Sequence, residues 1–136
     1  MTGALSITVL DERFALCRLP AGAPVPEWAS RAVAFLTISR TPTELSIVAD
    51  ESVVPAGMDA RRGYLALRVE GPLPLELVGV LASLATTLAA AAVPIFPIAT
   101  HDTDYLFVPG SELARAVTAL VAAGHRILTA AADHRS

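Results

Sequence analysis

The chain has 136 residues, a net charge of −3 and 54% hydrophobic residues, so it can form one compact domain or two very small ones around an apolar core. No run of like charge occurs, which argues against nucleic acid and acidic membrane surfaces as partners. The single cysteine, Cys17, excludes an internal disulfide and a multi-cysteine metal site. Because it lies in an apolar run, we expect a buried, unreactive thiol.

One apolar stretch, residues 77–96, lacks charged residues and approaches the ~20 residues of a membrane-spanning helix. Alanine, Ser83, Thr86 and Thr87 dilute its apolarity, Pro94 interrupts it, and no basic cluster flanks it. We therefore interpret it as a covered core helix followed by a strand. The N-terminus lacks a basic region and a long apolar run, so we expect no secretion signal and a cytoplasmic location.

The first half of the chain predicts short strands joined by polar turns. Residues 6–10 and 14–19 are strand candidates on either side of the polar triplet 11–13, a pattern that favours a hairpin. Residues 27–32 predict one turn of helix anchored by Trp28. Further strands are expected at 35–39, 45–49 and 64–69.

The longest helix is predicted to begin in the Gly-Pro-Leu-Pro sequence of residues 71–74, because proline fits the first helical turn and not the interior. Its apolar stripe comprises Leu77, Leu81, Leu84 and Leu88. Pro94 ends this helical region.

The remaining elements follow in order: a strand at 95–99, a polar turn at 100–104 and a strand at 105–108. A second helix is predicted over 111–123, with Ser111 as its N-cap and Gly124 beyond its C-terminus. We expect His125 to complement that C-terminus, and a last strand over 126–129.

The order of these elements between residues 64 and 129 is β-α-β-β-α-β, which predicts an α+β, ferredoxin-like fold. A weak internal repeat aligns 35–49 with 95–109 at an offset of 60, so that Glu44 falls on Asp104. The repeat predicts two related units, the first with shortened helices. Their expected bounds are 1–62 for the reduced unit, 63–130 for the complete βαββαβ unit and 131–136 for a tail.

A family resemblance covers most of the chain. It is carried by FLTISRTPTELSIVADE (35–51), by LRVEGPLPLELVGVLASLATTLAAAAVPIFPIATHDTDYLFVP (67–109) and by AAGHRI (122–127). These stretches resemble the small bacterial tandem ACT-domain proteins, which are similar to the regulatory part of aspartate kinase and to the eukaryotic arginine sensors upstream of TOR. The resemblance implies two ferredoxin-like ACT units, often in a homodimer, that bind a small molecule, commonly an amino acid, between units.

Two loops carry the candidate binding chemistry. The loop 70–74 is expected to open a helix, and helix N-termini suit a carboxylate. The turn 100–104 offers carboxylates, hydroxyls and an imidazole for an ammonium or guanidinium group. By the resemblance, the candidate lining comprises Leu73, Glu76, Val80, Thr100, His101, Asp102 and Asp104, together with Ser39, Arg40, Thr41 and Glu44 from the equivalent turn of the first unit.

Other interpretations of these residues stay open. Both turns can be solvated, with Asp102 and Asp104 making turn hydrogen bonds, and Glu76 can simply stabilise a helix N-terminus. Three donors at His101, Asp102 and Asp104 are weak support for a metal, and we predict no metal or cofactor. Without a nucleophile–base pair or a glycine-rich phosphate loop, we predict no enzyme. The leading hypothesis is a cytoplasmic, non-catalytic regulatory protein that binds an amino acid; the alternative is a ligand-free protein–protein interaction module.

Overall fold

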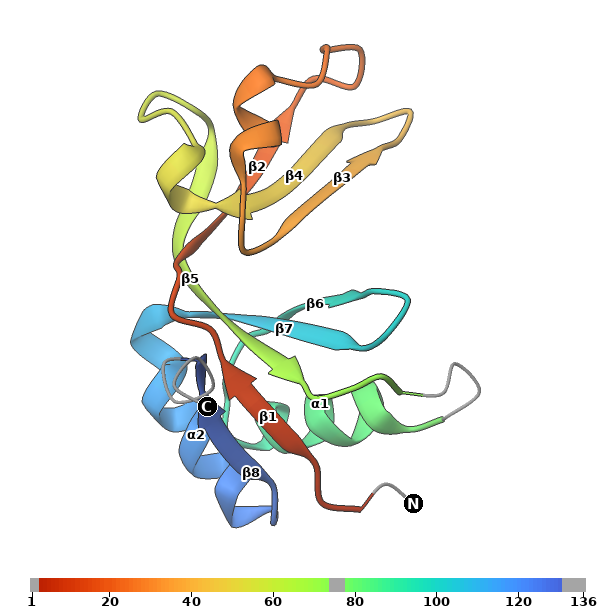
Figure 1. The fold of residues 1–136 in the computed structure, drawn as a ribbon, viewed down its shortest axis with the longest axis vertical. Helices are drawn as coiled ribbons and strands as arrows, with labels where there is room; N and C mark the ends of the chain where they lie inside the picture. Colours follow the sequence, from red (N-terminus) through yellow and green to blue (C-terminus); the bar gives the residue numbers. More distant parts are fainter. Residues whose placement is uncertain (1–2, 74–77, 131–136) are drawn as a thin grey trace. The chain divides into compact units, whose positions relative to one another are not determined.

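The computed structural model describes residues 3–73 and 78–130, which form two compact units. One unit spans Glu12–Tyr64, and the other combines the segment up to Asp11 with the chain from Leu65 onward. The division therefore differs from the boundary expected after residue 62, because the N-terminal strand groups with the C-terminal unit. Figure 1 shows this strand, β1, in red among green and blue elements.

The Glu12–Tyr64 unit is a four-stranded antiparallel sheet with two short 3-10 helices. Its elements are β2 (Phe14–Leu19), η1 (Glu27–Arg31), β3 (Leu36–Arg40), β4 (Leu45–Asp50), η2 (Glu51–Val53) and the first half of β5 (Ala60–Val69). The strands lie in the order β3-β4-β2-β5. This is the ferredoxin-like arrangement with single turns in place of full helices, as the sequence predicted.

The core of this unit lies between its sheet and the 3-10 turns. Trp28 is 9% exposed and packs with Cys17, which is 2% exposed. Burial raises the pKa of the Cys17 thiol, partly offset by the charge of Arg62. The expectation of a buried thiol is therefore confirmed.

A buried carboxylate holds the loop between η1 and β3. Asp50, at the end of β4, is 5% exposed, and its two oxygens accept hydrogen bonds from the backbone N–H groups of Val33, Ala34 and Phe35 at 3.0–3.2 Å. A buried carboxylate needs such donors, because leaving a buried polar group unpaired costs about 1–3 kcal/mol. Asp50 is thus fully engaged by its own chain.

The other unit is a five-stranded sheet with two helices. Its elements are β1 (Ser6–Val9), the second half of β5, α1 (Val80–Ala90), β6 (Phe96–Ala99), β7 (Asp104–Pro109), η3 (Gly110–Glu112), α2 (Leu113–Ala122) and β8 (Arg126–Thr129). From β5 onward the order is β-α-β-β-α-β, as predicted. The strands lie in the order β6-β7-β5-β1-β8, so β1 separates β5 from β8.

The pairing of β1 corrects the predicted N-terminal hairpin. Ile7 lies opposite Val69 of β5 in an antiparallel ladder and opposite Ile127 of β8 in a parallel one. β2 instead pairs with β4 and β5. The polar triplet 11–13 is a turn signal, but Ile7 is completely buried in the C-terminal unit, and this long-range burial decides the pairing.

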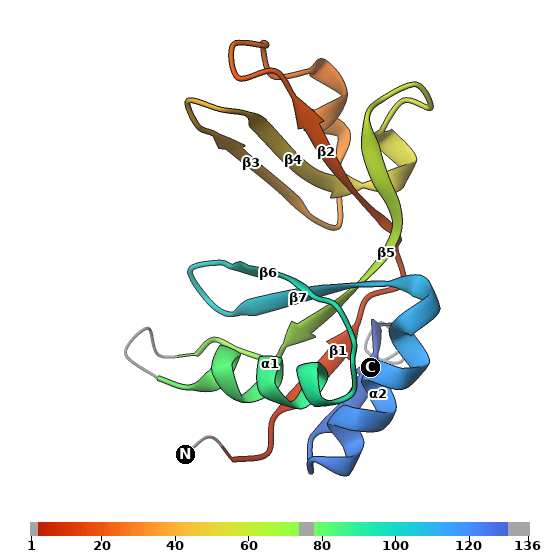
Figure 2. The same ribbon diagram turned by 180° about the vertical axis from the view of Figure 1, so that it is seen from behind.

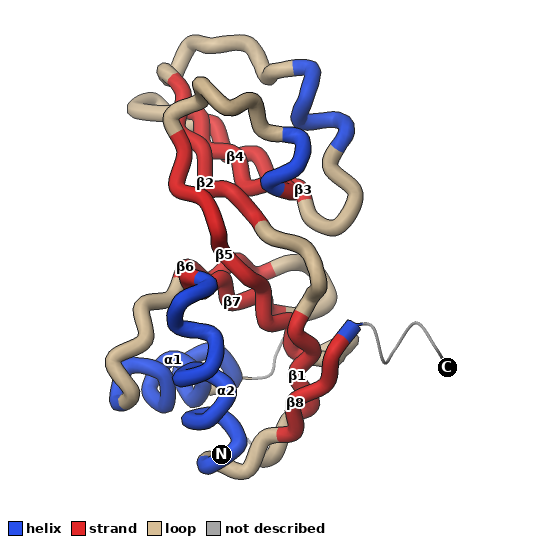
Figure 3. Tube along the Cα trace, turned by 90° about the vertical axis from the view of Figure 1, so that its left-hand side faces the viewer, coloured by secondary structure: helices blue, strands red, loops and turns tan. Residues whose placement is uncertain are grey.

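Both helices cover one face of the five-stranded sheet (Figures 2 and 3). Leu84 and Leu88 of α1 and Leu120 of α2 are fully buried against Leu67 and Leu106 of the sheet. Within the described part of the chain, no helix combines the length and apolarity that crossing a membrane requires. The apolar stretch is a core helix followed by a strand.

Two predicted helix starts are wrong. The first helix begins at Val80 rather than at residues 71–74, because Gly79 adopts a left-handed φ of 91° that the helix cannot contain. Its buried positions are Val80, Leu84 and Leu88, while Leu81 is 37% exposed and Leu77 lies outside the described residues. In the second helix, Ser111 lies in η3 and makes no capping bond.

A left-handed glycine lies just beyond the end of helix α2. After α2, Gly124 has a φ of 98°, its N–H donates to the Val121 carbonyl, and the N–H of His125 donates to the Leu120 carbonyl. The predicted role of Gly124 is confirmed. The His125 ring is 8% exposed, and its Nδ1 accepts a hydrogen bond from the Leu5 N–H at 3.1 Å, so the ring serves the backbone of the N-terminal segment.

The two hairpins β3–β4 and β6–β7 correspond at an offset of 59 rather than the expected 60. Arg40 pairs with Leu45, and Ala99 pairs with Asp104, so Leu45 rather than Glu44 corresponds to Asp104. A slip of one residue moves every side chain to the other face of a strand. The true equivalents in the turns are Thr41 and Thr100.

A substitution at the end of α1 should stabilise the protein. Ala92 takes the position that Gly124 takes after α2, with a φ of 60° that is unfavourable for a residue with a Cβ. We expect Ala92→Gly to raise the free energy of unfolding by about 1 kcal/mol in urea denaturation, because glycine relieves this cost. The matched Ala82→Gly, inside α1, should instead lower stability by about 0.5–1 kcal/mol. An Ala92→Gly protein no more stable than the parent would contradict the left-handed conformation of Ala92.

Candidate functional site

The loop after β5 is attached to the turn between β6 and β7. The Leu73 N–H donates to the Asp102 carbonyl at 2.7 Å, and the Thr103 hydroxyl donates to the Val69 carbonyl at 2.6 Å. Gly71 lies between them, where a Cβ would come within 3.0 Å of the Asp102 carbonyl oxygen. The two loops that the sequence singled out therefore lie side by side in one unit.

The turn itself is closed by Thr100. Its N–H and hydroxyl both donate to the Thr103 carbonyl, at 2.8 and 3.1 Å, and its hydroxyl oxygen accepts from the Thr103 N–H at 3.3 Å. These bonds fix the backbone of the turn. The Asp102 carboxylate remains at the surface, 70% exposed, with Oδ1 2.9 Å from Nδ1 of His101.

A charged pair lies next to this junction. Arg68 donates from Nε and Nη2 to Oε2 of Glu70, at 3.2 and 3.1 Å, and the Thr8 hydroxyl donates to the same oxygen at 2.7 Å. Oε1 of Glu70 accepts no hydrogen bond from the described residues. One oxygen of this carboxylate is therefore committed and the other is open.

The pair shifts both pKa values. Partial burial alone would raise the pKa of the Glu70 carboxyl, but the hydrogen bonds from Thr8 and Arg68 and the charge of Arg68 lower it below its usual value. Burial likewise opposes the charge of Arg68, yet Glu70 and then Tyr105 raise its pKa above the ordinary value. Both groups are held in their charged forms.

These elements border an open cavity of about 260 Å³. It is bounded by the loop after β5, by the 100–103 turn and by Tyr105 of β7. Its lining residues are Arg68, Val69, Glu70, Gly71, Pro72, Thr100, Asp102, Thr103 and Tyr105. The cavity presents a guanidinium, two carboxylates and a phenol to one small volume.

The other candidates in this unit lie elsewhere. Leu73 packs against the core cluster, and Val80 is only 4% exposed within it. The His101 side chain is 87% exposed, and Asp104 is half-buried at the start of β7. Glu76 lies outside the described residues. Because α1 begins at Val80, the loop after β5 does not present the helix N-terminus that was expected there.

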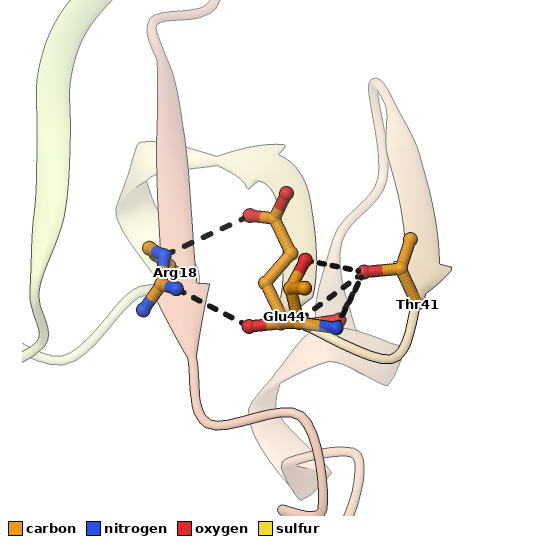
Figure 4. A network of polar contacts seen from close by, with 4 residues as sticks. Arg18, Thr41 and Glu44 are labelled. Carbon is orange, nitrogen blue, oxygen red and sulfur yellow. Dashed lines mark hydrogen bonds and ion pairs between the residues drawn. The ribbon is translucent and has the colours of Figure 1, made fainter.

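The candidates of the first hairpin are engaged within their own unit (Figure 4). Thr41 closes the β3–β4 turn as Thr100 closes the other, and Glu44 lies 3.9 Å from Nε of Arg18. Arg40 donates to the carbonyls of Ala21 and Ala23. Ser39 pairs with Ser46 in the β3–β4 ladder. These contacts give each residue except Ser39 a side-chain role in holding loops.

The sequence did not point to Arg68 or Tyr105 as site residues, and it placed Glu70 in a candidate loop without giving its side chain a role. Glu70 follows the last residue of β5 and is two positions from Arg68, so extended backbone puts the two side chains on one side, and this spacing was the available signal. Tyr105 lies on the neighbouring strand β7, and only the strand order brings it to the same place. No group of His, Cys, Asp and Glu among the described residues is arranged to hold a metal ion.

Comparisons with known proteins agree with this architecture. Residues 59–122 match the family model of the ACT domain, and residues 12–57 match a model for the N-terminal domain of another family. A crystal structure of a protein from Agrobacterium tumefaciens is 28% identical with a TM-score of 0.87, covering 94% of this chain and 95% of that one. No protein of curated function matches the sequence.

Two further structures show the fold alone. A Vibrio cholerae protein described as of unknown function and a possible transport protein is 22% identical, with a TM-score of 0.70 over 86% of this chain and 88% of that chain. The regulatory subunit of aspartate kinase from Thermus thermophilus, in its ligand-free form, is 12% identical, with a TM-score of 0.57 over 88% and 95% of the two chains. Residues 59–122 are thus similar to the ACT domain, and the chain shares its fold with the regulatory subunit of aspartate kinase.

The close approach at Gly71 predicts a costly substitution. Gly71→Ala would place a Cβ 3.0 Å from the Asp102 carbonyl oxygen and 3.1 Å from the Leu73 nitrogen, both backbone atoms that cannot rotate away. We expect a loss of about 1–3 kcal/mol in urea denaturation, the usual cost of overpacking. Gly57→Ala, with nothing within 4 Å of its Cβ, should change stability by no more than about 0.5 kcal/mol. Equal effects at the two glycines would argue against the loop–turn junction.

The lowered pKa of Glu70 predicts a pH dependence. The carboxylate stabilises the folded state above its unfolded pKa of about 4.3, and this contribution is lost as pH falls through the lower folded value. The stability difference between the parent and Glu70→Gln should therefore be largest near neutral pH and shrink below about pH 4. Urea denaturation at several pH values measures it. Glu12→Gln, at an exposed carboxylate, controls for loss of one surface charge. A difference independent of pH would exclude the ion pair as its source.

Proposed function

We propose that this protein is a non-catalytic, cytoplasmic regulatory protein of the tandem ACT type that binds a small zwitterion, a free amino acid, in the cavity beside Arg68 and Glu70. The proposal rests on one observation: groups of both charge signs line a single small cavity. The ACT-domain match and the shared fold with the aspartate kinase regulatory subunit support a regulatory role.

The charges suggest how such a ligand lies. The open Oε1 of Glu70 and the exposed carboxylate of Asp102 are acceptors for an ammonium group. The guanidinium of Arg68 supplies positive charge for a carboxylate. The volume of about 260 Å³ suits a molecule smaller than a nucleotide.

The neighbouring loops give the site a means of responding. Asp102 carries both a candidate contact, its carboxylate, and the carbonyl that holds Leu73. Leu73 in turn packs on the core beneath α1. A ligand held by the Asp102 carboxylate would therefore act on the segment leading to α1.

A second function is favoured by one different feature. β3 is the edge strand of its sheet, and its Leu36 and Ile38 are 41% and 40% exposed. Exposed edge strands with apolar side chains accept a strand from a partner. Pairing with another protein, or with a second copy in a homodimer, would use this edge and would not require a ligand.

A thermal-shift screen against the common amino acids tests the first proposal. A ligand at about 100 times its dissociation constant adds about 2.7 kcal/mol of stability, which corresponds to a rise of several degrees in Tm. Asp102→Asn should remove the part of this rise that comes from the cavity beside Arg68, while leaving the unliganded Tm unchanged, because its side chain is 70% exposed. Asp59→Asn, at an exposed acid of the other unit, is the matched control. A screen without any shift would reject amino-acid binding and direct attention to the β3 edge.

A further inference from the structure

The Glu12–Tyr64 unit contains a second cavity, which shares no residue with the cavity beside Arg68. Its volume is about 560 Å³, within the roughly 300–1,000 Å³ of small-molecule sites. It lies where the N-terminal end of β2 meets η2 and the first half of β5. Its lining residues are Glu12, Arg13, Asp50, Glu51, Ser52, Val54, Ala56 and Arg62.

The charged groups around this cavity do not neutralise one another. Five charged side chains line it, yet none of them forms an ion pair with any described residue. Opposite charges gathered around one concave surface normally pair or point apart. Apart from Asp50, which is engaged by backbone N–H groups, these side chains keep groups that can interact with a molecule in the cavity.

The individual hydrogen bonds show which groups are available. The Asp50 carboxylate is occupied by three backbone N–H groups. Glu51 uses Oε1 to accept the Gly63 N–H at 2.7 Å, and Arg62 uses Nη2 to donate to the Pro55 carbonyl at 2.6 Å. Each of these last two side chains keeps its other end open within the described residues.

Glu12 and Arg13 are freer still. Neither side chain makes a hydrogen bond to any residue that the structure describes, and both are exposed and line the cavity. The available groups are therefore two carboxylates, on Glu12 and Glu51, and two guanidinium groups, on Arg13 and Arg62. Their charges balance, so a ligand of zero net charge that carries both signs fits them best.

We propose that this cavity is a second binding site, for a free amino acid or a short peptide with unblocked ends. The ligand carboxylate is held by Arg13 and Arg62, and its ammonium group by Glu12 and Glu51. Guanidinium–carboxylate contacts have a preferred geometry, so they would fix the orientation of the ligand. Val54, which is 7% exposed, and Ala56 provide apolar surface for the rest of the molecule.

This inference does not depend on the site beside Arg68, which lies in the other unit. A ¹⁵N-resolved NMR titration separates the two, because it reports each backbone amide by itself. The probes are the common amino acids and unblocked dipeptides of glycine, added singly to the full chain at millimolar concentration. We expect saturable chemical-shift changes at the amides of Arg13, Glu51 and Gly63. Whether an amino acid or a dipeptide causes these changes shows which of the two classes of ligand the cavity binds.

Matched variants test the roles of the arginines. Arg13→Gln should weaken the apparent affinity by about tenfold or more, the loss expected for one charge-assisted hydrogen bond. Arg61→Gln is the control, because Arg61 is exposed, adjoins Arg62 on β5 and is absent from the lining. Asp102→Asn should leave these shifts unchanged even where it removes shifts at residues 100–105.

Blocked ligands test the assignment of charges. The N-acetylated and C-amidated forms of the same probes lose one charge each, so both should bind more weakly than the free forms. Absence of shifts with every probe, equal binding of blocked and free forms, or an Arg13→Gln protein that binds like the Arg61→Gln control would each overturn the proposal. If Arg13→Gln alters the unliganded spectrum beyond neighbouring residues, Arg62→Lys, which keeps the charge and loses the planar fork, replaces it as the test variant.

Discussion

One strand belongs to both sheets of this protein. β5 pairs through residues 60–64 with β2 in one unit and through residues 67–69 with β1 in the other. The sense and register of both ladders are therefore set along a single stretch of backbone. Ala60 of β5 packs in the core of one unit, and Leu67 and Val69 pack in the core of the other. Arg68 forms the charged pair with Glu70, the residue that follows the strand.

Much of the fold could be predicted because the strands and the second helix carry local patterns. The bounds of β2 and β8 were predicted without error, and the ferredoxin-like order was confirmed. The position of β1 was not predictable from its neighbours, since the residues it pairs with are over fifty positions away, and a polar triplet suggested a nearer partner. Likewise, Pro72 fits a helix start, but the left-handed conformation of Gly79 delayed that start to Val80.

Part of the candidate site could be predicted because two of its loops carry local sequence patterns. The turn of residues 100–104 and the loop before residue 74 are visible in the sequence as clusters of polar or helix-starting residues, and the structure brings them together. The charged pair beside them was missed because Arg68 and Glu70 look like the outward-facing residues of any half-buried strand. Their distinction lies in a third partner, Thr8, which comes from the inserted strand β1. Local periodicity cannot reveal a hydrogen bond across sixty-two positions.

The placement of β1 has a consequence for how the chain is made. The inserted unit has all its strands once residue 64 has been synthesised, whereas β1 stays without its parallel neighbour until residues 126–129 exist. Ile7 and Thr8 must therefore remain in an incomplete sheet until their partners Ile127 and Leu128 have been made. Such non-local pairings form slowly. All the strands of the Glu12–Tyr64 unit are therefore available before the parallel ladder of β1 and β8 can form.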